Sequence, residues 1–110
     1  MIGWIVMAAA MAQAATPLAC PARHRGRTLD AVAVYDGPVE DKAILAPDSS
    51  HRTGGVLTQR WDVAGIYRAG RALTVECGYG GIAPLRLTSS RPLRTCRASW
   101  SKAGNSLSCR

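Results

Sequence analysis

The sequence contains no phenylalanine, and aromatic residues of any kind make up only 5% of its 110 positions. Proteins that bind single-stranded nucleic acid stack the bases on aromatic rings, so this composition gives little support to nucleic acid as a partner. Internal repeats, low-complexity tracts and long linkers are missing as well. We therefore expect one domain.

A hydrophobic run long enough to span a membrane is also missing. Residues 2–15 carry no charge, but polar residues interrupt the run before it reaches the roughly 20 apolar residues of a transmembrane helix. The run ends in Ala12-Gln13-Ala14, the small-x-small pattern that signal peptidases cleave. We predict a signal peptide over 1–14, a single β-rich domain over 15–110, a periplasmic or secreted location, and no transmembrane segment in the mature form.

Closely spaced C-x2-C pairs, which are typical of zinc sites, do not occur. Four cysteines, separated by 57, 19 and 13 positions, all lie outside the predicted signal peptide: Cys20, Cys77, Cys96 and Cys109. In an exported protein, an even set of this kind predicts two structural disulfides. The core of so small a domain is marginal, and a bridge that closes a loop of about 14 residues adds roughly 3 kcal/mol in the chain-entropy model.

Acidic residues are scarce in the second half of the chain. Fourteen Lys and Arg against seven Asp and Glu give a net charge of +7, and from Arg68 onward eight basic residues face Glu76 alone. Such a basic surface would attract anionic components of the cell envelope. The candidate contact residues are Arg86, Arg91, Arg94 and Arg97. The alternative is that twelve Arg against two Lys reflect a GC-rich genome, with the charge serving solubility.

Apolar and polar residues alternate with a period of two, which predicts half-buried strands. We expect six strands, over residues 28–35, 56–63, 73–79, 82–89, 94–100 and 106–109. At most one short helix fits, within 38–46, and the polar segment 48–55 is expected to be a surface loop. Short turns between antiparallel strands predict a mostly β fold, a small sheet curled into a barrel or sandwich.

The core is predicted from the same alternation. Leu73, Val75, Cys77 and Tyr79 share one face of their strand. Leu57 and Trp61 should point inward from the 56–63 strand with Gln59 as a polar intruder, and Trp100 should lie in the core or at its rim.

The order of the strands bears on the disulfide pairing. In a simple meander, Cys77 and Cys96 flank the 82–89 strand and lie about 10 Å apart, which is too far for a disulfide. This favours Cys20–Cys77 together with Cys96–Cys109, although a strongly curled sheet leaves the other pairings open.

Catalytic signatures are weak. Asp48-Ser49-Ser50-His51 has the residue types of a hydrolase triad, but they are contiguous, and no G-x-S-x-G elbow is present. Four carboxylates in one region could bind Ca²⁺, but their spacing matches no EF-hand and turn residues explain them as well: Asp36, Glu40, Asp41 and Asp48. We therefore expect no enzyme, no metal and no cofactor.

Several short motifs resemble a family of small exported proteins of Gram-negative bacteria that has no assigned function. They are Ala19-Cys20-Pro21, Val34-Tyr35-Asp36-Gly37-Pro38, Leu45-Ala46-Pro47-Asp48, Trp61-Asp62 and Val75-Glu76-Cys77-Gly78-Tyr79-Gly80-Gly81, with Cys96 downstream. The resemblance spans nearly all of the mature chain. It implies export and a single domain, and it contributes no catalytic residues.

The expected architecture is also similar to that of periplasmic lysozyme inhibitors. Their Ser-Gly-x-x-Tyr type of loop has no clear counterpart here, and a basic lysozyme would be repelled by a chain of net charge +7. The sequence thus predicts an exported, non-enzymatic domain whose partner is unknown. An anionic envelope component is the first hypothesis, and protein–protein contact in envelope assembly is the alternative.

Overall fold

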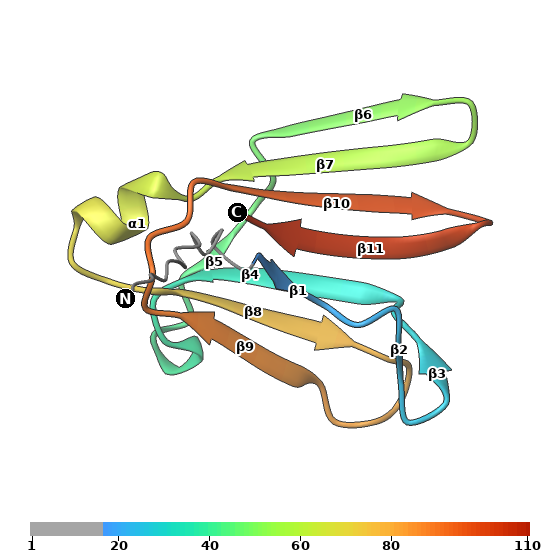
Figure 1. Ribbon diagram of the computed structural model, residues 1–110, viewed down its shortest axis with the longest axis horizontal. Coiled ribbons are helices and arrows are strands. Elements are labelled where there is room, and N and C mark those ends of the chain that lie inside the picture. The colour runs from blue at the N-terminus through green and yellow to red at the C-terminus, as the bar shows by residue number, and fades with distance from the viewer. Residues whose placement is uncertain (1–16) are drawn as a thin grey trace, which may run out of the picture.

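Alternating apolar residues build two antiparallel sheets whose apolar sides face each other (Figure 1). The computed structural model describes residues 17–110. The predicted signal peptide and its cleavage site lie outside these residues and stay a prediction. The prediction of a mostly β fold is confirmed, and of the two expected forms the structure is compatible with a sandwich rather than with a closed barrel.

The first sheet has four strands in the order β5 (Ile44–Leu45), β4 (Ala31–Asp36), β8 (Leu73–Gly78) and β9 (Leu85–Ser89). All three pairings are antiparallel. The buried positions of β8 alternate with partly exposed ones, as a sheet with one solvated side requires.

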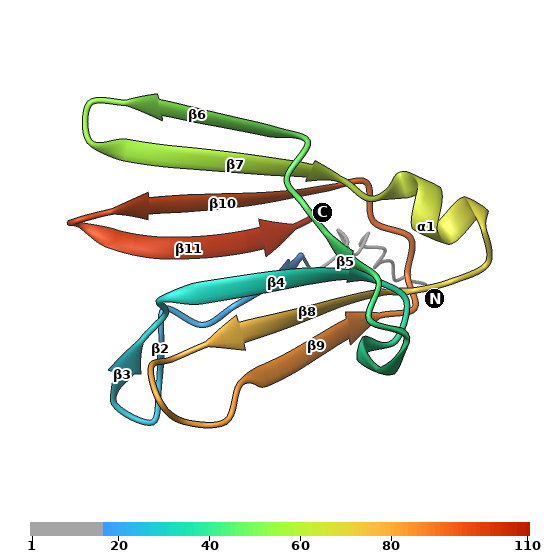
Figure 2. The ribbon, with the colours of Figure 1, turned by 180° about the vertical axis from the view of Figure 1, so that it is seen from behind.

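The second sheet has five strands in the order β1 (Leu18–Ala19), β11 (Gly104–Cys109), β10 (Thr95–Ser101), β7 (Val56–Asp62) and β6 (Ser49–Thr53). The first and last strands of the described chain are therefore neighbours, since Leu18 lies opposite Cys109. Figure 2 shows that the hairpin of β6 and β7 and that of β10 and β11 run beside each other.

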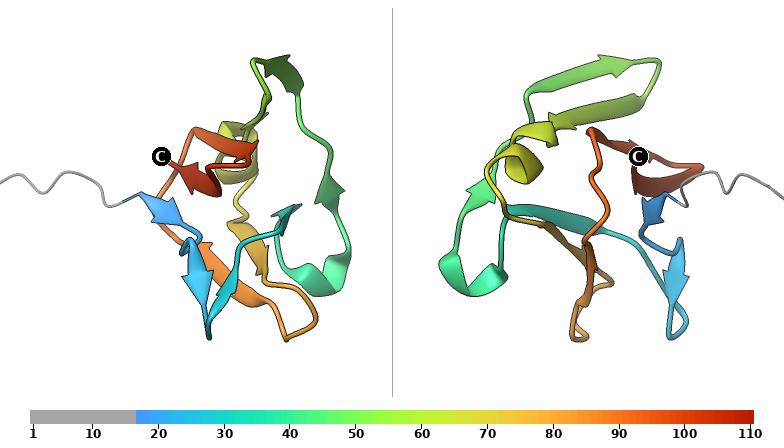
Figure 3. Two further views of the ribbon diagram at one scale, coloured as in Figure 1. Left: turned by 90° about the vertical axis from the view of Figure 1, so that its right-hand side faces the viewer. Right: turned by 60° about the vertical axis from the view of Figure 1, so that its left-hand side comes forward.

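The remaining elements are short. β2 (Arg23–His24) and β3 (Arg27–Thr28) form a small hairpin, and η1 (Val39–Asp41) is one 3-10 turn. The α-helix α1 (Ala64–Arg68) lies at one end of the two layers (Figures 1 and 3). Within residues 17–110, no helix has the length and apolar character of a membrane span.

All six predicted strands are found, as β4 and β7–β11, but two other expectations are wrong. Residues 48–55 are not a loop: they contain β6, whose five residues are all exposed and therefore give no hydrophobic pattern. Residues 38–46 hold one 3-10 turn, in agreement with the expectation of at most one short helix, and the single α-helix of the described residues lies at 64–68, too short for helical periodicity to show. The sheets are not a simple meander, because β4 pairs with β8 and β7 pairs with β10.

The core lies between the two sheets, as predicted. Four alternating residues of the β8 segment are at most 1% exposed: Leu73, Val75, Cys77 and Tyr79. Trp61 is 4% exposed and Trp100 lies at the rim. Gln59 is tolerated on the inner side because its Oε1 accepts a hydrogen bond of 2.8 Å from the Trp100 indole N–H.

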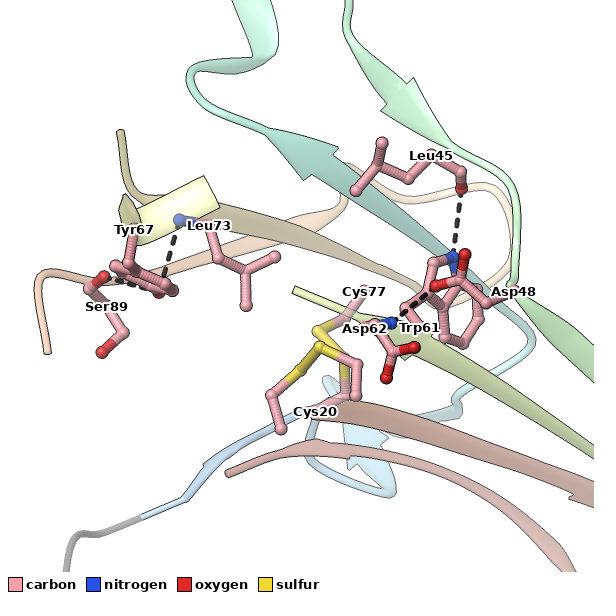
Figure 4. Close-up of a disulfide and its surroundings, with 11 residues drawn as sticks. Cys20, Leu45, Asp48, Trp61, Asp62, Tyr67, Leu73, Cys77 and Ser89 are labelled. Carbon is pink, nitrogen blue, oxygen red and sulfur yellow. Dashed lines mark hydrogen bonds between the residues drawn. A yellow bond between two sulfur atoms is a disulfide. The ribbon is translucent and has the colours of Figure 1, made fainter. Parts of the chain in front are cut away.

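Polar and covalent links join the two sheets through this core (Figure 4). Cys20, just after β1, forms a disulfide with Cys77 of β8. The indole N–H of Trp61 in β7 donates to the Leu45 carbonyl in β5, at 3.1 Å. At the end marked by α1, the Tyr67 hydroxyl donates to the Ser89 carbonyl, at 3.0 Å, and so docks the helix on the four-stranded sheet.

Candidate functional site

The structure distributes the four predicted contact arginines over both sheets rather than along one stripe. Arg86 lies on β9 of the four-stranded sheet and Arg97 on β10 of the five-stranded sheet. Arg91 and Arg94 lie in the connection between these strands, and all four are exposed. Their role in binding stays a prediction.

Charged side chains of the four-stranded sheet are held in pairs, on its outer face and at the end of β4. The Arg86 guanidinium lies 2.8 Å from the Glu76 carboxylate and 3.9 Å from that of Glu40. Arg71 forms two hydrogen bonds with Asp36, at 2.7 and 3.0 Å. Arg86, Glu40 and Arg71 line a shallow hollow of about 540 Å³, together with Val39 and Leu87 among others.

The pairing changes the acidity of these groups. The hydrogen bond from Arg71 lowers the pKa of Asp36, and the bond to Glu76 raises the pKa of Arg86. Burial, followed by the charge of Glu76, raises the pKa of Tyr35. Each shift favours the protonation state already present at neutral pH, so this face shows stable ion pairs rather than a proton donor or acceptor set for catalysis.

The outer face of the five-stranded sheet is lined by hydroxyl groups, and we call it the hydroxyl face. Residues directly opposite each other in antiparallel strands point to the same side, so the register gives its members. Its Ser and Thr residues are Ser49, Thr53, Thr58, Thr95, Ser99, Ser101, Ser106 and Ser108. One row crosses all five strands: Ser49, Arg60, Arg97, Ser108 and Ala19.

Two arginines line a hollow on this face, which we call the arginine hollow. It measures about 370 Å³ and is lined by Thr95, Arg97, Ser108 and Arg110. Among the described residues, neither Arg97 nor Arg110 has a carboxylate within ion-pair distance. Arg60, directly opposite Arg97, is paired with Asp62 at 3.0 Å. The patch therefore carries three guanidinium groups and the single carboxylate of Asp62.

The triad-like segment does not assemble a triad. Asp48 accepts a hydrogen bond of 2.6 Å from the backbone N–H of Asp62, which anchors β6 beside the end of β7. His51 is exposed and its ring contacts the Thr53 hydroxyl at 2.7 Å. Successive side chains of a strand point to opposite sides, so Ser49 and Ser50 cannot both face this ring. The candidate calcium carboxylates are also separated: within 17–110, no group of three or more metal-ligating side chains forms.

All four cysteines are paired, in the combination that the sequence favoured. Cys20 bonds Cys77, with Cα atoms 5.8 Å apart, and Cys96 bonds Cys109 directly opposite on the neighbouring strand. The argument from a meander was nevertheless wrong, since β9 and β10 belong to different sheets. Cys77 and Cys96 lie apart because the chain changes layers between them.

Sequence reasoning missed Arg60, Arg110 and the serines as members of one surface. Arg97 and Arg110 each follow a buried half-cystine, so alternation alone places both side chains outward. The pairing of β10 with both β7 and β11 brings these outward residues together, and that pairing is not encoded in any local pattern.

Comparison with known proteins gives one match. A family model described as Type VI secretion system Tli immunity protein matches residues 22–110, which is nearly the whole described part of the chain. No curated protein and no solved structure matches it. The expectation of a small bacterial protein family is thus confirmed, whereas the individual motifs quoted for the earlier resemblance remain untested.

Proposed function

The chain belongs to the type VI secretion system Tli immunity protein family, and from this premise we propose that it is a non-enzymatic immunity protein that binds a type VI effector protein. Binding in the periplasm protects the producing cell from the effector. The observation that carries the proposal is the family match itself. The match covers every strand except β1 and three of the four cysteines, since only Cys20 precedes it.

The distribution of polar groups supports binding rather than catalysis. Among the described residues, every buried side chain of the core is apolar, a cysteine or Tyr79, and none is charged. Catalytic acids, bases and nucleophiles are usually tuned by partial burial. Here no charged group of the described residues is buried, and the outer faces of the two sheets are broad surfaces that suit a protein partner.

The cysteines support a periplasmic location. Both disulfides are intramolecular and no cysteine of the described chain is free. Disulfides persist in oxidising compartments, in agreement with the predicted signal peptide over 1–14. An immunity protein must meet its effector where the effector acts, so export and binding belong to one proposal.

The family match favours a protein partner over the anionic envelope component that the charge suggested. A net charge of +7 is compatible with either partner. An acidic effector surface would be attracted to the chain at long range, which raises the association rate at low salt. The lysozyme-inhibitor alternative would need a basic partner and is disfavoured on the same physical ground.

A competition experiment tests the proposal. A strain that carries this chain and an active type VI secretion system serves as attacker, and a sister strain without the chain serves as recipient. We expect the recipient to be killed, and the full-length chain to restore its survival. A chain without residues 1–14 should fail to protect, because it stays in the cytoplasm.

The control is an attacker whose secretion system is inactivated, which should kill neither recipient. The effector is then identified as the protein that co-purifies with the tagged chain and whose deletion from the attacker abolishes killing. Survival of the unprotected recipient, or protection by the chain without residues 1–14, would contradict the proposed immunity function or its location, respectively.

A further inference from the structure

The two sheets differ in how many of their arginines are already paired, and on the hydroxyl face only Arg60 has a carboxylate partner, Asp62, within the described residues. On the four-stranded sheet, Arg86 and Arg71 are held by carboxylates of the same chain. On the hydroxyl face, Arg97 and Arg110 have no such partner within residues 17–110. An exposed guanidinium without a partner keeps its five donors for another molecule.

The arrangement of the hydroxyl face is unfavourable for the fold alone. Arg60 and Arg97 lie directly opposite each other on adjacent strands, and like charges in that position destabilise a sheet. Arg110 lies one row away, opposite Thr95 through a pair of backbone hydrogen bonds of 2.9 and 3.0 Å. Arg60 is held by Asp62, but Arg97 and Arg110 lie on the same face without a carboxylate partner among the described residues, and a negatively charged partner would neutralise them.

The chemistry of the arginine hollow indicates what that partner presents. Guanidinium groups bind carboxylates through two parallel N–H···O bonds, and the hollow of about 370 Å³ brings two of them together with Thr95 and Ser108. The surrounding serine and threonine hydroxyls both donate and accept, so they suit the mixed polar groups of a protein surface. A surface of phosphates alone would leave their donor-and-acceptor capacity largely unused.

We infer that the hydroxyl face is the surface that binds the effector, and that a carboxylate side chain of the effector enters the arginine hollow between Arg97 and Arg110. This inference rests on the proposed immunity function. Five strands spaced by about 4.8 Å give a face about 20 Å wide, so it forms the centre of an interface rather than all of it. Residues at the centre dominate binding energy, and arginine is enriched among them.

The test is the affinity of the purified mature protein for the effector identified by co-purification, measured by calorimetry at low and high salt. The variant R97E/R110E reverses both charges in the hollow, and we expect it to bind at least about 100-fold more weakly. The matched control is R25E/R52E, which changes the net charge equally. Arg52 lies on β6 of the same sheet but points to the other side, since it pairs with Leu57. The control should bind within about threefold of the native protein.

A third variant, R97K/R110K, separates charge from shape. Lysine keeps the charge but lacks the two-pronged geometry, so its affinity should lie between those of the native protein and R97E/R110E. Circular dichroism and thermal melting of each variant show whether it is folded. An affinity of folded R97E/R110E within about threefold of native would overturn the inference while leaving the immunity function intact.

Two other outcomes are equally decisive. Native protein that neither binds nor neutralises any effector removes the proposed function, and this inference with it. Lipopolysaccharide micelles are tested in parallel: if R97E/R110E loses binding to the micelles but keeps its affinity for the effector, the hydroxyl face is a polyanion site and the inference is wrong.

Discussion

The two sheets differ in how many of their arginines have a carboxylate partner within the chain. The four-stranded sheet places Arg86 beside Glu76, and Arg71 beside Asp36 at the end of β4, so these charges are neutralised within the chain. The five-stranded sheet places Arg97 opposite Arg60, which is paired with Asp62, and leaves Arg97 and Arg110 without a carboxylate partner among the described residues. The difference teaches that a count of net charge is a poor guide to a binding surface. The informative quantity is which charges lack a partner in the folded chain.

The largest expected effect concerns the link between the sheets. Replacing Cys20 and Cys77 by serine opens a cross-link with a sequence separation of 57, and the chain-entropy model gives a loss of about 4 kcal/mol. The same change at Cys96 and Cys109, within one sheet, spans a separation of 13 and costs about 3 kcal/mol. Urea unfolding of both variants measures which of them loses more free energy of unfolding. A larger loss for the Cys96–Cys109 pair would show that the two sheets do not depend on their covalent link.

Next in size is the charge reversal Arg86→Glu on the four-stranded sheet. It removes the partner of Glu76, whose side chain is only 18% exposed, and places a like charge directly across the strand pair. We expect the melting temperature to fall by roughly 4 °C. The conservative variant Arg86→Lys should recover part of this loss. A melting temperature equal to that of the native protein would show that the ion pairs of this face contribute nothing to its stability.

A smaller effect is expected from pH. Arg71 lowers the pKa of Asp36, so the folded state holds this proton less tightly than the unfolded state, whose pKa is about 3.9. The stabilisation is present above that value and is lost as the pH falls through the lower folded pKa. Asp36→Asn should therefore melt slightly below the native protein at pH 7, and the gap should narrow as the pH falls below the unfolded pKa of about 3.9. Melting curves from pH 7 to pH 2 measure it; a gap that persists at pH 2 would assign the effect to something other than this pair.

The smallest effect on stability is expected from R97E/R110E, the variant with the largest expected effect on binding. The change replaces the positive charge opposite Arg60 by a negative one, while Arg60 keeps its ion pair with Asp62, so the melting temperature should stay level or rise by about 2 °C. The variant for comparison is Arg86→Glu, a single Arg-to-Glu change on the other sheet. If the melting temperature of R97E/R110E fell as far as that of Arg86→Glu, the two sheets would not differ in how much their arginines contribute to stability.

Local patterns predicted most of the strands because each buries alternate residues. The residues of β8 show it best, since Leu73, Val75 and Cys77 are completely buried and Thr74 and Glu76 are not. The same logic failed for β6, where Ser49–Thr53 are held by backbone bonds to β7 and bury nothing. The five-residue helix α1 buries only Ile66, so it also leaves no hydrophobic pattern in the sequence.

The candidate site was less predictable than the fold because it depends on which strands are neighbours. Arg97 was among the predicted contact residues, and its exposure follows from alternation with Cys96 and Ala98. Its association with Arg110 and Arg60 requires that β10 lie between β11 and β7. That arrangement is decided by the packing of two layers and not by any spacing along the chain.

The connectivity of the half-cystines has a consequence for how the chain is oxidised. Counted from the N-terminus, the first cysteine pairs with the second and the third with the fourth. A chain that crosses a membrane N-terminus first presents Cys20 and Cys77 before either of the others, so joining thiols in their order of arrival yields the native bonds without reshuffling. The sheet itself must wait longer, because β1 has its neighbour only when β11, the last strand, has arrived.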